Sequence, residues 1–119
     1  MPVPSAGLPL RLTAAAAFLV VATLNAGGYR YGASDQAFYI PAVLQQLDPS
    51  LFPRDRALLA PQARVFLVDE IVGEAIRATG WSIETWFAIL YVVTVLALAG
   101  ALWALGQRAY RTPLAVWTL

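Results

Sequence analysis

One run of the sequence, Trp86 to Gly106 (WFAILYVVTVLALAGALWALG), contains no charged residue at all. A helix needs about 20 such residues to cross the hydrocarbon core of a bilayer. Ser82 is placed to cap the start of this helix, and Glu84 lies in its first turn, where the helix dipole favours a negative charge. Aromatic residues that suit a membrane interface lie near both ends: Trp81, Trp86, Trp103 and Tyr110. The run predicts a transmembrane helix over residues 84–106.

The composition agrees with a membrane protein. The 119 residues allow one domain at most, and with 60% hydrophobic and 13% charged residues the mean hydropathy of +0.65 is too high for a soluble domain of this size. The chain has no cysteine, which excludes disulfides and thiolate metal sites, and no histidine, the usual general base and commonest metal ligand. A net charge of +1 offers no basic face for a nucleic acid.

A second apolar run, LTAAAAFLVVATLNAGG, begins at Leu12 and is short for a membrane span. Including the preceding LPLR, with Arg11 reaching the interface, extends it to a predicted transmembrane helix over residues 8–27. The alternative is a cleaved signal peptide. Two features count against a signal peptide. Arg11 is the only charged residue before the apolar run, and cleavage after Ala26 would place Leu24 at the −3 position, where a small residue is preferred. An uncleaved helix is therefore favoured, with the signal peptide left open.

The charges predict how the chain crosses the membrane. All seven acidic residues lie between residues 35 and 84, whereas Arg11 precedes the first run and Arg108 and Arg111 follow the second. Because cytoplasmic segments carry the excess of arginine, both ends are expected in the cytoplasm and the loop over residues 28–83 outside it. The sequence thus predicts an all-α, multi-pass protein of the inner (plasma) membrane.

The loop holds two segments with helical periodicity, near residues 35–47 and 61–79. In the first, Ser34 is a candidate N-cap, Pro41 is expected to kink the middle, and Pro49 to end the helix. Its apolar stripe falls at helical spacing: Ile40, Val43, Leu44 and Leu47.

The second segment carries its apolar stripe at Val65, Val68, Val72, Ala75 and Ile76. Glu70, Glu74 and Arg77 occupy the opposite, solvated side, and Glu74 and Arg77 can pair across one turn. Both segments are too short and polar to span a bilayer, so they are expected to lie on its surface or to pack on other helices. Residues 112–119 resemble the start of a third, truncated span, which suggests the N-terminal part of a longer protein.

Candidate chemistry is concentrated just after the first apolar run. A turn at Gly27-Gly28 would present YRYGASDQ at the outer interface. There Asp35 can serve as a general base toward a hydroxyl or as a ligand for a divalent metal, and Arg30 can pair with a lipid phosphate. The alternatives are that Asp35 only stabilises a helix start and that Arg30 only meets lipid headgroups.

Further residues of the loop are candidate substrate contacts. Tyr39 can contact a substrate or simply anchor the helix at the interface. Arg54 or Arg56 can bind a lipid phosphate, or the stretch can simply form a rigid turn with Pro49 and Pro53.

The string SDQAFYIPAVLQQLDPSLFPRD resembles loops in uncharacterised bacterial membrane proteins related to the GT-C class of glycosyltransferases. In those loops an acid, a Tyr-x-Pro and an LDPSLFP-x-D follow the first span, and the resemblance extends over roughly residues 8–106. It implies a multi-pass enzyme that takes sugars from polyprenyl-phosphate donors, with Asp35 as the catalytic acid of the first loop. Many members carry two adjacent acids there, whereas Gln36 follows Asp35 in this chain.

Two other kinds of protein fit the same pattern. One is a small non-enzymatic membrane protein that assembles with further transmembrane helices, of its own or another chain, through the small residues of ALALAGALWALG. The other is a secreted amphipathic segment whose first run is removed.

Overall fold

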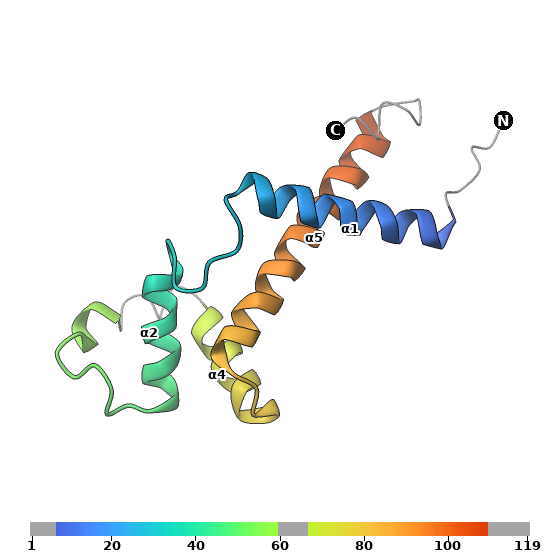
Figure 1. Ribbon diagram of the computed structural model, residues 1–119. Helices are drawn as coiled ribbons and strands as arrows, with labels where there is room; N and C mark the ends of the chain where they lie inside the picture. Colours follow the sequence, from blue (N-terminus) through green and yellow to red (C-terminus); the bar gives the residue numbers. More distant parts are fainter. Residues whose placement is uncertain (1–6, 60–66, 110–119) are drawn as a thin grey trace. The chain divides into compact units, whose positions relative to one another are not determined.

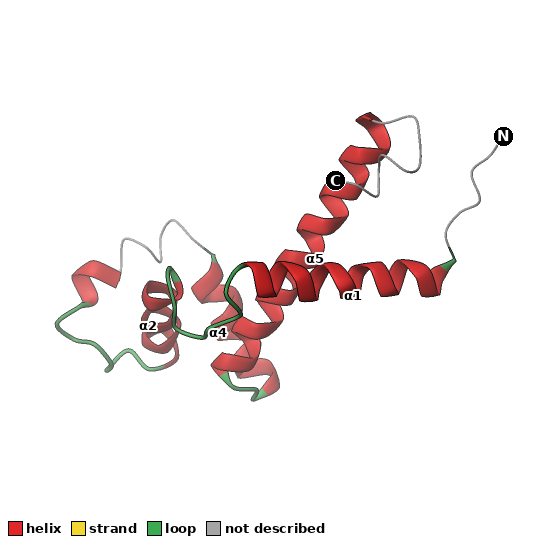
Figure 2. Ribbon diagram, turned by 45° about the horizontal axis from the view of Figure 1, so that its top comes forward, coloured by secondary structure: helices red, strands yellow, loops and turns green. Residues whose placement is uncertain are grey.

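The computed structural model describes residues 7–59 and 67–109, and every regular element in these two ranges is a helix (Figure 1). The helices are α1 (Leu8–Asn25), α2 (Gln36–Leu47), α4 (Val68–Thr79) and α5 (Ile83–Ala109). Residues 56–59 add a helical turn, and no described residue lies in a strand (Figure 2). The expected third span at residues 112–119 lies outside the described residues.

The chain divides into two compact units, which are described separately. One, the apolar unit, comprises residues 1–29 and 90–119, and the other, the loop unit, comprises residues 30–89. Helix α5 begins in the loop unit and continues into the apolar unit.

Helix α1 begins with Pro9 in its first turn, where a missing N–H costs nothing. It ends in a Schellman motif: the Gly27 N–H donates to the Leu24 carbonyl (3.1 Å) and the Gly28 N–H to the Thr23 carbonyl (2.8 Å). Gly27 and Gly28 have φ values of 78° and 87°, which glycine adopts without steric cost. The expected turn at this pair is therefore present, and its hydrogen bonds stop the helix.

Helix α5 starts where its cap was expected. The Ser82 hydroxyl accepts a hydrogen bond from the Thr85 backbone N–H (3.3 Å). With 27 residues α5, like the 18-residue α1, is long and apolar enough to cross a membrane, and α1 buries none of its side chains.

The ends of α2 and α4 follow from local backbone chemistry. Asp35, not Ser34, is the N-cap of α2; Ser34 has a φ of 54°, so the expected Ser34 cap is wrong. At the other end Asp48 is extended before Pro49, because proline disfavours a helical residue ahead of it. Of the second predicted segment, residues 68–79 are helical and residues 61–66 lie outside the described ranges. A left-handed Gly80, with a φ of 69°, ends α4.

Helices α2 and α4 pack side by side and run in the same direction (Figures 1 and 2). Val43 of α2 and Val72 of α4 are fully buried. A valine buried to this extent contributes about 1.5–3 kcal/mol relative to an exposed one. Gly73 allows the close approach, since a Cβ there would lie 3.2 Å from the side chain of Gln46. This pair is the core of the loop unit.

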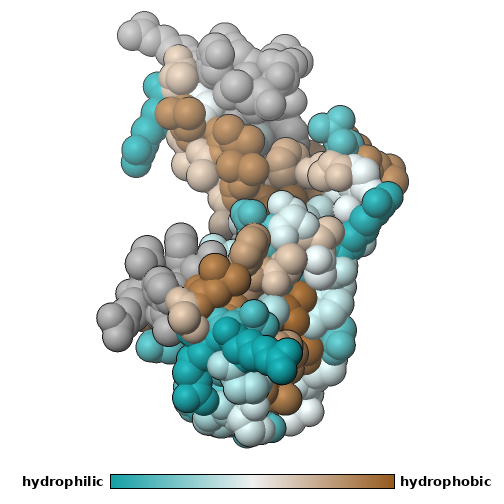
Figure 3. Space-filling view, turned by 90° about the vertical axis from the view of Figure 1, so that its left-hand side faces the viewer, coloured by the Kyte–Doolittle hydropathy of each residue, from teal (hydrophilic) through white to brown (hydrophobic). Residues whose placement is uncertain are grey.

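The hydrophobic core of the described residues is small for so apolar a chain. It consists of Ala42, Val43, Leu59, Val72 and Phe87. Many large apolar side chains remain exposed, and on the face shown in Figure 3 hydrophobic residues reach the surface beside hydrophilic ones. A surface of this kind suits contact with lipid or with other helices.

Candidate functional site

Asp35 lies at the start of α2 with its carboxylate exposed. Although Asp35 is the N-cap residue, its side chain makes no capping hydrogen bond. The turn before the helix is held instead by Gln36, whose Oε1 accepts a hydrogen bond from the Gly32 N–H (2.9 Å). The Asp35 carboxylate therefore has no hydrogen bond or ion pair within the described residues and is available to a ligand.

The other three candidate residues also belong to the loop unit. Arg30 and Arg54 are exposed, and Tyr39 is half-buried on α2, one turn beyond Asp35. In the described part of the chain no hydrogen bond or ion pair joins Asp35 to either arginine. The structure thus presents these groups separately and does not assemble them into one bonded cluster.

The stretch after α2 forms the ordered turn that its prolines predict. The Asp48 carboxylate accepts hydrogen bonds from the Ser50 hydroxyl (2.6 Å) and the Ser50 N–H (2.9 Å). The bond from the Ser50 hydroxyl is the main cause, and the bond from the Ser50 N–H the second, of a pKa of Asp48 below its ordinary value of 3.8. Arg56 donates to the Pro49 carbonyl (2.8 Å), so Arg56 is engaged in the turn while Arg54 is not. Of the two arginines, Arg54 is the better candidate for an anionic ligand.

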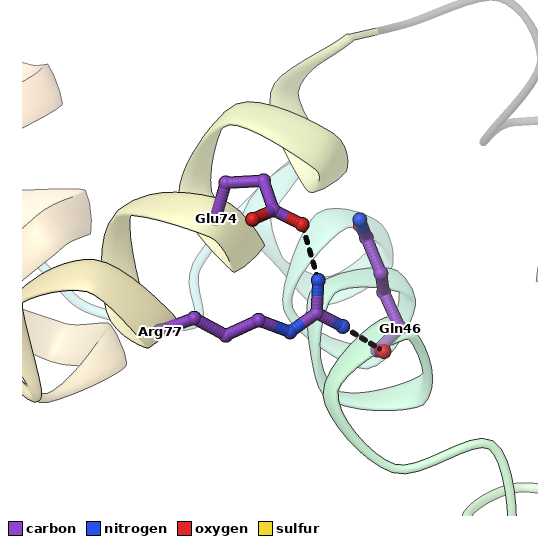
Figure 4. Close-up of polar contacts among 3 residues, drawn as sticks. All are labelled: Gln46, Glu74 and Arg77. Atoms are coloured by element: carbon purple, nitrogen blue, oxygen red, sulfur yellow. Dashed lines mark hydrogen bonds and ion pairs between the residues drawn. The ribbon is translucent and has the colours of Figure 1, made fainter.

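Arg77 connects α4 to α2 (Figure 4). Its guanidinium pairs with Glu74 one turn earlier and donates to the Gln46 carbonyl (2.7 Å), one of the last carbonyls of α2. Arginine suits this position because its planar fork can serve two acceptors at once. The expected pair of Glu74 and Arg77 is confirmed. The hydrogen bond from Arg77 to Gln46 could not be predicted from a local pattern, because the two residues lie 31 positions apart in the sequence.

The apolar unit contains its own polar contact. The Tyr91 hydroxyl of α5 donates to the Thr23 hydroxyl of α1 (2.9 Å), and the Tyr91 ring stacks on Tyr29 at a centroid distance of 5.0 Å. An interhelical hydrogen bond between apolar helices helps to hold them together in lipid. A threonine and a tyrosine within the apolar runs are visible in the sequence, but that Thr23 and Tyr91 pair with each other depends on tertiary structure.

In the described ranges no three acidic side chains come together as a set that could hold a metal ion. A divalent metal at Asp35, which the sequence left open, would need ligands beyond this carboxylate.

The sequence matches no protein-family model, no curated protein and no solved structure.

Proposed function

We propose that α1 and α5 both cross the inner (plasma) membrane, with the N-terminus in the cytoplasm and the loop over residues 28–83 outside it. The length and apolar surface of both helices support this arrangement. So does the charge distribution, because Arg11 and Arg108 lie beside the cytoplasmic ends and the acids lie between the spans.

We further propose that the loop contributes to a glycosyltransferase of the GT-C type, which transfers a sugar from a polyprenyl-phosphate donor. The observation that carries this proposal is the exposed Asp35 carboxylate, which is not used to cap its own helix. A carboxylate in that position can remove the proton from an acceptor hydroxyl. The hydroxyl oxygen then attacks the anomeric carbon of the sugar, and the bond from that carbon to the phosphate oxygen breaks.

The arginines of the loop fit the leaving group of this reaction. Arg30 and Arg54 are exposed cations without an ion pair in the described residues. Guanidinium groups bind phosphate through two parallel hydrogen bonds, which would stabilise the negative charge left on the lipid phosphate. Two membrane helices cannot enclose a lipid-linked donor, so the proposal requires further spans from this chain or another.

The test is transferase activity of an Asp35→Asn variant in native membranes, with whichever helices complete the protein present. Amide nitrogen cannot accept the acceptor's proton, so activity is expected to fall by about 100-fold or more. Asp55→Asn is the matched control, because Asp55 is an exposed acid of the same loop and should retain activity. Full activity of Asp35→Asn at an unchanged membrane level would overturn the catalytic role.

A second candidate function is assembly with other membrane helices without catalysis. It is favoured by the exposed surface of α1 and by Gly100 of α5, where no group of the described residues fills the space that a neighbouring helix would take. Under this alternative Gly100→Leu would disrupt a complex seen by cross-linking in membranes, whereas Asp35→Asn would have no effect on function.

A further inference from the structure

Helix α4 has a second apolar face in addition to the one that packs on α2. Val72 and Gly73 are buried on the packed side. Leu67 and Ile71 are 66% and 60% exposed, and Ala78 is exposed on the same side of the helix. Leu67, Ile71 and Ala78 together form what we call the outer face of α4. Nothing in the described part of the chain covers it.

The outer face adjoins the charged side of the helix, because Glu74 lies one turn after Ile71 and one turn before Ala78. Glu70, Glu74 and Arg77 form their own exposed strip, with Arg77 tied to Glu74 and to the end of α2. Helix α4 therefore has three strips: one packed on α2, one charged, and one apolar and exposed. A helix with an apolar and a charged face both open is suited to a boundary between water and an apolar phase.

The residues after α4 indicate which apolar phase this is. Gly80, in the left-handed conformation, ends α4 before α5 begins at Ile83. In the short connection Trp81 is 53% exposed and stacks on Trp86 at a centroid distance of 5.9 Å. The Trp86 indole N–H donates to the Thr79 hydroxyl (3.2 Å), which fixes the aromatic pair to the end of α4. Exposed indoles of this kind concentrate at the headgroup level of membranes.

We propose that the outer face of α4, with Trp81, is embedded in the headgroup–acyl boundary of the extracytoplasmic leaflet, so that α4 lies along the membrane surface. The occupant of this face is lipid, because only three residues separate α4 from a helix that itself enters the bilayer. The inference rests on the proposed crossing of the membrane by α5. Because α2 packs on α4, the same anchor holds α2 and Asp35 close to the surface at which the phosphate of a polyprenyl-phosphate lies.

The absence of native cysteine allows a direct test by site-directed spin labelling. Single variants Leu67→Cys and Ile71→Cys report on the outer face, and Glu70→Cys reports on the charged strip of the same helix. Val93→Cys reports on α5, where the side chain is 56% exposed. Each full chain carries a nitroxide in vesicles of phosphatidylethanolamine and phosphatidylglycerol. Collision with oxygen, which partitions into lipid, is compared with collision with a water-soluble nickel chelate.

If the outer face is embedded in lipid, labels at residues 67 and 71 should collide several-fold more with oxygen than with the chelate. The label at residue 70 should collide more with the chelate than with oxygen. Water exposure at 67 and 71 would overturn it, as would protection of both labels from both reagents, since protection indicates a protein partner. The label at residue 93 separates the two proposals. If it is lipid-exposed while 67 and 71 are not, only the surface anchor fails; if it is water-exposed, the membrane span itself fails.

Discussion

At the scale of single residues, two acids in the loop behave differently although both lie at an end of α2. Asp48, after the helix, is held by two hydrogen bonds from Ser50. Asp35, before it, has no side-chain cap bond. An acid that is already bonded within its own turn contributes to the fold, whereas an exposed acid without such bonds is free to act on a ligand. This difference separates Asp35 from Asp48 as a candidate catalytic group.

Removing the Ser50 hydroxyl should raise the pKa of Asp48 toward its ordinary value of 3.8, because that hydroxyl is the main group lowering it. Because the pKa of Asp48 is lower in the folded state, its ionised form stabilises the turn at pH values above the ordinary pKa of 3.8. This stabilisation is lost as the pH falls through the pKa of the folded state. Ser50→Ala should therefore make the turn less dependent on pH in this acidic range. Carboxyl carbon shifts titrated by NMR measure the change, and Ser34→Ala is the control. An unchanged Asp48 pKa would contradict the assigned cause.

At the scale of elements, the helices could be predicted from sequence because their signals are local. The Ser82 cap and Pro49 act on the backbone within a few residues, and the structure has a helix start and a helix end there. The uncharged run that ends at Gly106 lies wholly within α5, which continues to Ala109. What the sequence could not supply is which sides of the helices meet. The exposure of Leu67 and Ile71 depends on how α4 packs against α2, and no periodicity contains that information.

The candidate site also has one part that the sequence predicts and one part that depends on the folded structure. Residue type and position were enough to nominate Asp35, Arg30, Tyr39 and Arg54 as candidates. Whether the Asp35 carboxylate caps its helix, and whether Arg54 or Arg56 is engaged in the turn, depends on side-chain rotamers and on contacts several residues away. Arg77 illustrates the limit most clearly, since its bond to Gln46 joins two helices across 31 residues.

The packing of α2 on α4 makes Gly73 the most sensitive position of the pair. A leucine there would place its side chain where Gln46 lies, 3.2 Å from the first added carbon, and would separate the helices around Val43 and Val72. Gly73→Leu is expected to destabilise the loop unit by about 1–3 kcal/mol, as overpacking generally does. Hydrogen exchange of α2 amides in micelles measures the loss of protection.

Gly100→Leu provides the matched control for that substitution, because a Cβ at Gly100 meets no neighbouring group of residues 7–59 and 67–109 within 4 Å. It should leave the protection of α2 unchanged. Equal protection in Gly73→Leu and the parent chain would show that α2 and α4 do not pack through Gly73. Gly73→Ala is expected to fall between Gly73→Leu and the parent chain, because the helix propensity of alanine offsets part of the cost of the contact with Gln46.

At the scale of the whole molecule, the proposed topology is a consequence of charge placement and not of any one contact. Arginines flank the two apolar helices, and every acid lies in the segment between them or at its edge. The loop unit would thereby be placed on the side of the membrane where polyprenyl-phosphate sugars are used in the proposed reaction. Orientation is thus the property on which the outer face of α4, Asp35 and the arginines of the loop all depend.

Single cysteines can test this orientation without background labelling, because the native chain has none. Ala33→Cys lies in the exposed loop before α2, and Gln107→Cys lies at the exposed far end of α5. In intact cells a membrane-impermeant maleimide should label the cysteine at residue 33 at once, and the one at residue 107 only after permeabilisation. The reverse pattern would mean that the flanking arginines do not set the topology. Labelling of both in intact cells would mean that α5 does not cross the membrane, and with it the extracytoplasmic site at Asp35 would lose its physical basis.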